Sequence, residues 1–222
     1  MKDIPVFTGN GGIATLILKE IPYKNTAYVL LRSYLPQQRR LFFEECWRFC
    51  RAAGAQRILL CTQTPEPELP LAYKLLKLVR PAGLPLPVQP EVTLRPVTRE
   101  SLEQYVEIYN QLFLQAPGAA TYTMQTVGRI LEDGAYFAVK GQHVIGIGQL
   151  SGQEVLCIGV LPQCRGMGSQ VLAALLQTLE QEVTLQVASD NTAALRLYQK
   201  FGFQRQSALS YWYDLDPMFT GQ

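Results

Sequence analysis

The feature that most constrains this chain is a turn with two glycines, set between an apolar strand and an apolar helix. Residues 154–160, EVLCIGV, form a continuous apolar run that suits a central strand, and SQVLAALLQTLEQE, from Ser169, predicts a helix. Gly166 and Gly168 lack Cβ atoms, so the backbone between them can curl until consecutive N–H groups point into one concavity at the start of the helix. This arrangement is typical of a pyrophosphate site, although a turn with no ligand would also accept the glycines.

Two other classes of phosphate-binding protein do not fit this turn. A Walker loop needs the sequence G-K-[ST], which does not occur in the chain, so the lysine and the magnesium-binding hydroxyl of a nucleotide hydrolase are missing. A dinucleotide-binding fold needs the spacing G-x-G-x-x-G and an acidic residue about 20 positions later. Asp190 follows Gly168 at a suitable distance, but the glycine spacing differs.

From residue 91 onward, strand-like and helix-like patterns alternate in the order β-α-α-β-β-β-α-β-α-β. Apolar residues recur at helical spacing in the helix segments and alternate or run continuously in the strand segments. We expect strands at 91–98, 154–160, 183–189 and 203–215, a hairpin over 135–152, and helices at 99–116, 123–134, 169–182 and 191–202.

A proline-rich connector, PAGLPLPVQP at 81–90, predicts a domain boundary because its four prolines lack N–H donors and block a helix. The expected organisation is an N-terminal α/β module over 1–80, this linker, and a C-terminal domain over 91–222. The module is expected to run β-α-β-α, with strands at 26–34 and 55–63 and helices at 39–54 and 71–80. Its strand-to-helix turn, LPQQRR, contains no glycine, so no phosphate-binding turn is predicted there.

Composition excludes several function classes. Hydrophobic residues make up 48% of the chain and charged residues 17%, which predicts a packed globular protein. No apolar run approaches the ~20 residues that span a bilayer, and the N-terminus lacks an apolar signal segment, so we expect a cytoplasmic protein with no membrane partner. Basic residues are dispersed, which argues against nucleic acid. Five cysteines without C-x-x-C spacing and one histidine predict neither a disulfide framework nor a metal site.

Two motifs resemble those of the GNAT N-acetyltransferase superfamily. Gln163-x-x-Gly166-x-Gly168 is similar to the family's [RQ]-x-x-G-x-[GA] motif, and NTAALRLYQKFGF at 191–203 is similar to its N-x-x-A-x-x-L-Y-x-K-x-G-F helix. The resemblance covers about residues 91–220. It implies an α/β (α+β) GNAT acyl-CoA N-acyltransferase fold, with a mixed central sheet flanked by helices. The module over 1–80 is then interpreted as a degenerate half of that fold, or as an unrelated α/β cap.

The resemblance also implies an activity and a partner. A GNAT protein is expected to use acetyl-CoA as co-substrate and to pass the acetyl group directly to an amine, which can belong to a small molecule, an amino acid or a protein N-terminus. The alternative is a catalytically inactive module that binds or senses acyl-CoA. A homodimer is left open.

The family pattern assigns cofactor contacts to particular positions. Acyl-CoA lies where the central strand and the next strand separate, with the pyrophosphate at the glycine turn. The implied cofactor-binding residues are Ile158, Gly159, Val160, Gln163, Cys164, Arg165, Gly166, Met167, Gly168, Ser169, Asn191 and Tyr198. Asn191 also opens a helix, so capping that helix is an equally good interpretation.

Two side chains are candidates for proton transfer. Direct aminolysis of a thioester leaves a thiolate, and family precedent points to the Tyr198 phenol as the acid that protonates it, although a core tyrosine is the alternative. Glu154 begins the central strand, where some family members keep a catalytic carboxylate that removes a proton from the amine. A solvated glutamate at a strand edge is the alternative.

Overall fold

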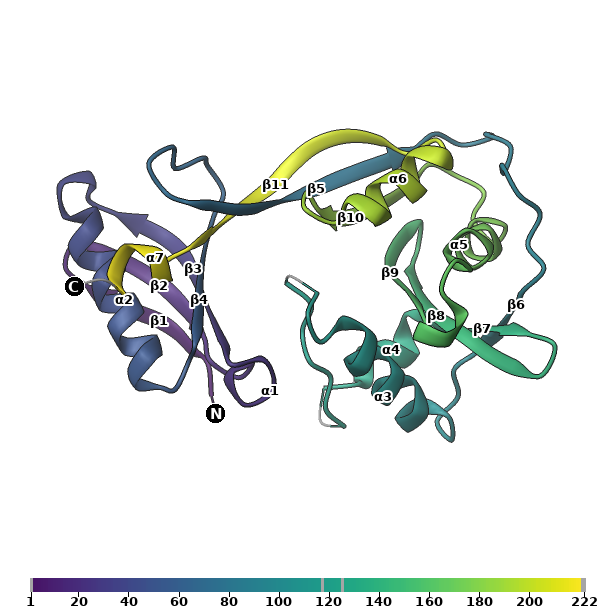
Figure 1. Cartoon of the computed structure of the whole chain (residues 1–222), viewed down its shortest axis with the longest axis horizontal. Coiled ribbons are helices and arrows are strands. Elements are labelled where there is room, and N and C mark those ends of the chain that lie inside the picture. Colours follow the sequence, from purple (N-terminus) through teal and green to yellow (C-terminus); the bar gives the residue numbers. More distant parts are fainter. Residues whose placement is uncertain (1, 117, 125, 221–222) are drawn as a thin grey trace. The chain divides into compact units, whose positions relative to one another are not determined.

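The computed structural model describes residues 2–116, 118–124 and 126–220, and the chain forms two compact units (Figure 1). Unit 1 consists of Met1–Leu75 and Ala208–Gln222, and unit 2 of Leu76–Ser207. The division falls inside two strands, β5 (Leu71–Arg80) and β11 (Gln204–Asp214), and not in the proline-rich connector. The last residues of the chain therefore belong with the N-terminal module, whereas the sequence prediction placed them in a domain over 91–222.

Unit 1 packs one long helix against a sheet with the strand order β1-β2-β3-β4-β11. The pairs β1–β2 and β2–β3 are antiparallel, and β3–β4 is parallel. Helix α2 turns Phe42, Phe43, Cys46 and Cys50 into the core at helical spacing. The bounds of the elements are β1 Ile4–Gly9, β2 Gly12–Ile17, α1 Ile21–Lys24, β3 Thr26–Tyr34, the 3₁₀ turn Pro36–Gln38, α2 Arg39–Ala52 and β4 Arg57–Thr62.

Residues 71–80 form strand β5, so the helix predicted for this segment is wrong. From Leu76 onward the buried side chains are Leu76, Leu78 and Arg80, which is the period of two that a strand shows. Leucine and lysine favour a helix locally, but β5 lies between β10 and β11 in the sheet, and this pairing overrides the local preference.

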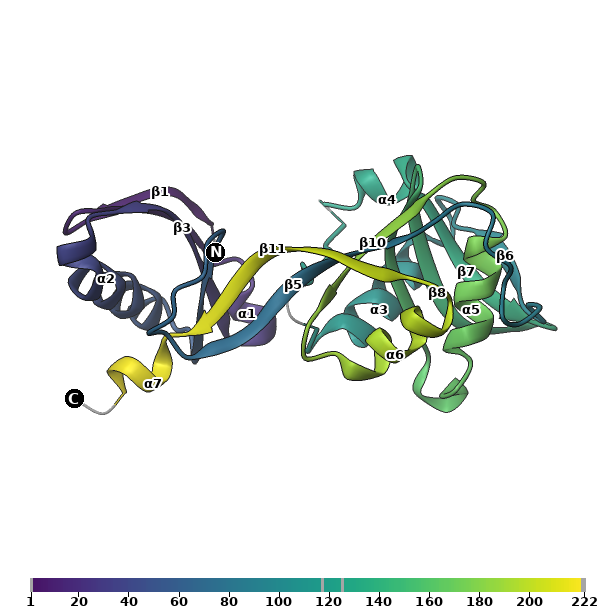
Figure 2. The same ribbon diagram turned by 90° about the horizontal axis from the view of Figure 1, so that it is seen from above.

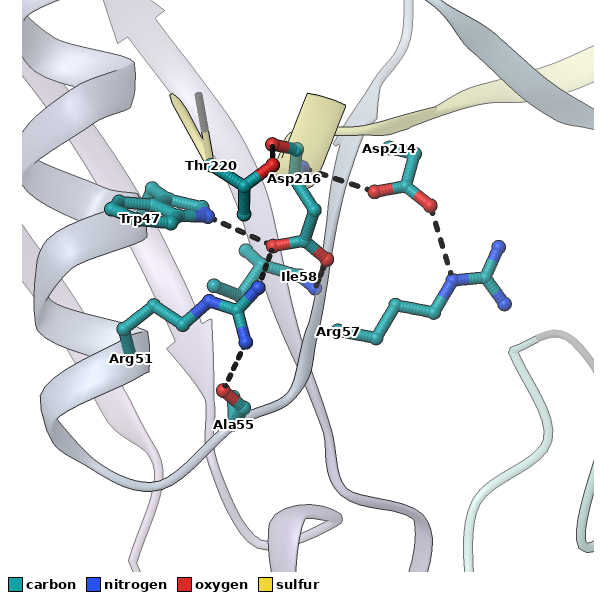
Figure 3. Close-up of polar contacts among 8 residues, drawn as sticks. All are labelled: Trp47, Arg51, Ala55, Arg57, Ile58, Asp214, Asp216 and Thr220. Carbon is teal, nitrogen blue, oxygen red and sulfur yellow. Dashed lines mark hydrogen bonds and ion pairs between the residues drawn. The ribbon is translucent and has the colours of Figure 1, made fainter. Parts of the chain in front are cut away.

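The C-terminal segment is fastened to unit 1 by the carboxylate of Asp216 (Figure 3). Trp47 Nε1 and Arg51 Nη2 donate to its Oδ1 at 2.8 Å each, and the backbone N–H of Ile58 donates to its Oδ2 at 3.1 Å. Asp216 begins the short helix α7 (Asp216–Phe219), and Phe219 is buried in the core of unit 1. The polar contacts and the apolar core thus hold the same segment.

Unit 2 has the strand order β11-β5-β10-β9-β8-β7-β6, with helices on both faces (Figure 2). The bounds of its elements are β6 Thr93–Pro96, α3 Leu102–Phe113, α4 Gly128–Glu132, β7 Gly134–Lys140, β8 His143–Ser151, β9 Glu154–Val160, the 3₁₀ turn Pro162–Cys164, α5 Gly168–Leu176, β10 Val183–Ala188 and α6 Thr192–Lys200. The predicted strands and hairpin are confirmed. Helix α4 is shorter than the helix predicted over 123–134, of which Gln125 lies outside the described residues, and Gly134 begins β7.

Helices α3 and α5 pack on opposite faces of the central strands, at positions where glycine leaves room. A Cβ atom at Gly159 would lie 2.6 Å from Leu112 of α3, and one at Gly148 would lie 2.7 Å from Leu175 of α5. Gly148 is opposite Ile158 in the β8–β9 ladder, so consecutive residues Ile158 and Gly159 face the two different helices. Strand β9 is therefore covered on both sides.

Across the described ranges, no helix has both the length and the apolar character needed to cross a bilayer. The same residues contain no cluster of His, Cys, Asp and Glu suited to a metal ion. All five cysteines are free thiols.

Candidate active site

Strands β9 and β10 run parallel but separate after a short paired stretch (Figure 1). They pair at Thr184↔Glu154 and Leu185↔Val155, and beyond these positions no pair between them is found among the residues that the structure describes. The parallel pair of unit 1 differs, because β3 and β4 stay paired from Thr26↔Arg57 to Leu30↔Cys61. Of these two parallel pairs, β9–β10 is therefore the one whose described residues leave main-chain groups unpaired along an opening.

A bulge at Leu156 marks the start of this opening. In the β8–β9 ladder Gln149 is opposite Cys157 and Leu150 is opposite Val155, so Leu156 has no partner. Further along, the N–H of Leu161 donates to the carbonyl of Ile145, at 2.9 Å. Since N–H groups alternate in direction along a strand, those of Ile158 and Val160 point away from β8 and toward the opening. This is the direction that the predicted main-chain contacts with the cofactor require.

The glycine turn between β9 and α5 contains one left-handed residue and several unpaired N–H groups. Gly166 adopts a φ of 100°, a left-handed conformation that favours glycine. The N–H groups of Gly166, Gly168 and Ser169 donate to no acceptor within the part of the chain that is described. Helix α5 begins here with Met167 at its N-cap and no capping side chain, so the positive end of its dipole is also unscreened. Unpaired donors at the N-terminus of a helix are the kind of group that suits an anion.

A groove of about 610 Å³ lies against this turn. It brings together β9, the turn and α6, and its lining residues are Val160, Leu161, Pro162, Arg165, Gly166, Gly168, Ser169, Ala193, Ala194 and Leu197. The sequence analysis had not included Ala193, Ala194 and Leu197 among the site residues. The sequence feature that indicated this role was the pair of small residues in the first turn of the helix, because small side chains let a ligand approach the backbone.

The other predicted cofactor residues lie near the groove without lining it. Gln163 is exposed, and Cys164 and Met167 are half-buried in the turn. Asn191 caps α6, since its Oδ1 accepts a hydrogen bond from the N–H of Ala194 at 3.1 Å. The structure thus shows the capping role that the sequence had left open, and the contact of Asn191 with a cofactor stays a prediction.

Tyr198 lies on α6 and is half-buried. Its ring packs edge-on against Phe203, with the centroids 5.8 Å apart. Burial, with a smaller contribution from the nearby thiol of Cys157, raises the pKa of Tyr198 to about 12. The phenol is therefore protonated at neutral pH and can act as a proton donor.

Glu154 lies at the paired end of β9. Its Oε1 accepts a hydrogen bond from the side-chain amide of Gln186 on β10, at 3.1 Å, and its side chain is half-buried. It lies four positions before Ile158, which corresponds to about 13 Å along a strand. The predicted role of Glu154 as a base stays a prediction.

A buried polar chain behind β9 was not predicted. Tyr105 of α3 contacts both Gln149 Oε1, at 3.5 Å, and Cys157 Sγ, at 3.7 Å, and Gln149 Nε2 donates to Asp133 Oδ2 at 3.2 Å. Burial raises the pKa of Cys157 to about 12, so its thiol is neutral and a poor nucleophile. The signal in the sequence was Gln149, a polar residue within an otherwise apolar hairpin.

Comparison with known proteins agrees with this geometry. Residues 98–203 match the acetyltransferase (GNAT) family. The chain is similar in structure to a GCN5-related N-acetyltransferase from Sphaerobacter thermophilus (14% identity, TM-score 0.59, 92% of this chain and 76% of that one) and to one from Kribbella flavida (14%, 0.58, 94% and 87%). It is also similar to a tandem GNAT protein from the clavulanic acid biosynthesis pathway (15%, 0.51, 92% and 78%). No curated protein matches the sequence.

The structural likenesses establish the fold, a mixed central sheet flanked by helices, as the sequence analysis expected. The family match includes the opening between β9 and β10, the glycine turn and α6 up to Phe203. Residues 98–203 therefore form a domain of the acetyltransferase (GNAT) family.

Proposed function

We propose that this protein is an N-acetyltransferase that uses acetyl-CoA and transfers the acetyl group directly to an amine. The observation that carries the proposal is the group of unpaired N–H donors at Gly166, Gly168 and Ser169, beside an opening in the sheet. Family membership makes acyl transfer plausible, and these donors give acyl-CoA a specific place to bind.

Different groups of the protein would contact the different parts of acetyl-CoA. A diphosphate would accept hydrogen bonds from the turn and from the N-terminus of α5, with the Arg165 guanidinium at the rim of the groove as counter-charge. Carbonyl oxygens of the pantetheine and of its thioester would accept hydrogen bonds from the N–H groups of Ile158 and Val160, much as a neighbouring strand would. When bound, acetyl-CoA supplies an acyl thioester, which an amine can attack.

We assign the proton transfers to the two predicted side chains. Tyr198 would donate its phenolic proton to the sulfur that leaves, because burial keeps this group protonated. Glu154 would remove a proton from the amine, through water, since its carboxylate lies at the paired end of β9 and not in the opening itself. Cys157 takes no covalent part in this scheme, because its neutral thiol is a poor nucleophile.

The acceptor in this proposal is a small amine or a peptide N-terminus. Release of free thiol from acetyl-CoA, followed with a chromogenic reagent across a panel of amines, amino acids and peptides, tests the proposal. We expect thiol release that depends on one class of amine. Tight binding of acetyl-CoA with no thiol release on any acceptor would instead favour a protein that senses acyl-CoA.

We propose further that unit 1 is a degenerate half of the same fold, with a structural role. The connections β1-β2-β3-α2-β4 repeat the order of β7-β8-β9-α5-β10, with two antiparallel pairs followed by a parallel crossover. A tandem GNAT protein is among the similar structures. The β3–β4 pair is closed and its turn has no glycine, so we expect unit 1 to bind no acyl-CoA. The free cysteines favour a reducing compartment such as the cytoplasm.

A further inference from the structure

The buried chain behind β9 has a fixed direction. The Gln149 amide nitrogen can only donate, so it donates to Asp133 Oδ2, and Gln149 Oε1 accepts the proton of the Tyr105 hydroxyl. The phenolic oxygen is then left to accept the S–H of Cys157. Each group in the chain has one role, and the orientation of the thiol follows from the carboxylate at the far end.

The middle of this polar chain is buried, whereas its ends, Cys157 and Asp133, are half-buried. Gln149 is 2% exposed and Tyr105 is fully buried, with its ring edge-on to Phe137 at 5.8 Å. Satisfied polar groups in such surroundings fix one arrangement, because any other arrangement leaves a buried donor or acceptor unpaired. Replacing one member of the chain would therefore affect the others.

The polar chain of Asp133, Gln149, Tyr105 and Cys157 lies beside the start of the opening between β9 and β10. Gln149 and Cys157 are directly opposite each other in the β8–β9 ladder, immediately beside the bulge at Leu156. Tyr105 reaches across this pair from α3 and binds both side chains. The ladder is interrupted at the bulge, so the side-chain contacts supply there the constraint that the missing backbone pair does not.

From this juxtaposition we infer that Tyr105 and Gln149 are positioning residues: they hold Cys157 and the bulged part of β9 from the α3 side, and so fix the N–H groups of Ile158 and Val160 that line the opening. This inference rests on the proposed function for its catalytic consequence. Donors held in place before a thioester binds polarise its carbonyl without a cost of reorganisation during the reaction.

The positioning of β9 by Tyr105 and Gln149 can be tested without any ligand. Hydrogen–deuterium exchange of the free protein should show that Tyr105→Phe, which removes only the hydroxyl, speeds exchange of the β9 amides that point toward β8, such as that of Gly159, by about tenfold or more while β10 stays unchanged. Tyr136→Phe is the matched control, since the hydroxyl of Tyr136 makes no hydrogen bond within the described part of the chain. Unchanged exchange in Tyr105→Phe, or the same change in Tyr136→Phe, would overturn the inference.

The consequence for catalysis is tested by isotope-edited infrared spectra of acetyl-CoA labelled with ¹³C at the carbonyl. In Tyr105→Phe and in Gln149→Met the bound carbonyl should absorb at higher wavenumber than in the wild type, and kcat should fall by about tenfold with a smaller change in the Kd for acetyl-CoA. The double variant should resemble either single variant, since both interrupt one chain. An unshifted carbonyl band in both variants would contradict the inference.

These two measurements also separate the inference from the proposed function. If the wild type binds no acetyl-CoA, the proposed function fails, and the exchange measurement still decides whether the chain holds β9. If Tyr105→Phe does not fold, Gln149→Met, which keeps the length of the side chain, decides the same question in the same exchange experiment.

Discussion

The side-chain oxygen of Asn191 accepts a hydrogen bond from the N–H of Ala194 at 3.1 Å, and this contact closes the N-terminus of α6. The N-terminus of α5, on another side of the same groove, has no capping side chain. Of the two helices that line the groove, one satisfies its own donors and the other presents them to a ligand. The N-terminus of α5 is therefore the one that suits an anion.

Gly166→Val tests whether the glycine turn binds the diphosphate of CoA. Gly166 has a φ of 100°, which a β-branched residue cannot adopt without strain, so the turn should rearrange and move its N–H groups. We expect calorimetry to show at least about a tenfold loss of affinity for CoA. Gly141→Val is the matched control, because Gly141 also has a positive φ and open surroundings but lies in the β7–β8 turn. A similar loss of affinity in this control would argue against a specific diphosphate site at the glycine turn.

Asn191→Ala separates capping from cofactor contact. Loss of the cap should lower the free energy of unfolding by about 1 kcal/mol, with the affinity for CoA changing by less than about threefold. Urea unfolding and calorimetry of the same preparation give both values. The opposite pattern, weak binding with unchanged stability, would return Asn191 to the cofactor-binding residues.

Tyr198→Phe tests the proposed acid. Removal of the phenolic proton should lower kcat by about 10²-fold and leave the Kd for acetyl-CoA unchanged. Because the pKa of Tyr198 is raised to about 12, the wild-type rate should show no loss from tyrosine ionisation below about pH 11. A pH–rate profile followed by thiol release checks this, and an unaltered kcat in the variant would remove Tyr198 from the mechanism.

Asp216→Ala tests how the C-terminal segment is held. The variant leaves Trp47 Nε1 and the N–H of Ile58 without their acceptor, so we expect unit 1 to lose about 2 kcal/mol of unfolding free energy in urea. Asp214→Ala, which removes a partly exposed ion pair with Arg57 and one hydrogen bond from the N–H of Asp216, should cost less. The affinity for CoA should not change under native conditions, since the groove lies within unit 2. Equal effects of the two variants would contradict the anchoring role.

Stability at alkaline pH follows from the buried thiols. Burial raises the pKa of Cys46 and Cys50 to about 12, above their ordinary value in the unfolded chain. Between these values the unfolded chain loses protons that the folded protein keeps, so the free energy of unfolding should fall as the pH rises above about 9. Urea titrations at pH 7 and pH 10 measure this, and Cys50→Ala should reduce the difference. Equal stability at both pH values would contradict a raised pKa for these two thiols.

The sequence predicted the local features of the site and missed the long-range ones. The left-handed Gly166, the capping Asn191 and the strand–turn–helix around them depend on neighbouring residues, so their pattern is visible in a short window. The strand at Leu71–Arg80 depends on pairing with residues more than 100 positions away, and its leucines and lysines suggested a helix. The anchoring of Asp216 by Trp47 depends on a similar distance, and no spacing within the sequence indicates it.

The bulge at Leu156 and the chain through Tyr105 were missed for a related reason. A bulge is a mismatch between two strands, and it can be seen only once their register is known. Gln149 was the one visible sign, and its meaning depends on which helix covers β8.

The central claim is that the N–H groups from Gly166 to Ser169 bind the diphosphate of coenzyme A. Calorimetric titration of the wild-type protein with coenzyme A and with pantetheine, which lacks the diphosphate, tests it most directly. We predict saturable binding of coenzyme A and binding of pantetheine that is weaker by about 10²-fold or more. Equal affinity for the two compounds, or no heat of binding with coenzyme A, would contradict the account.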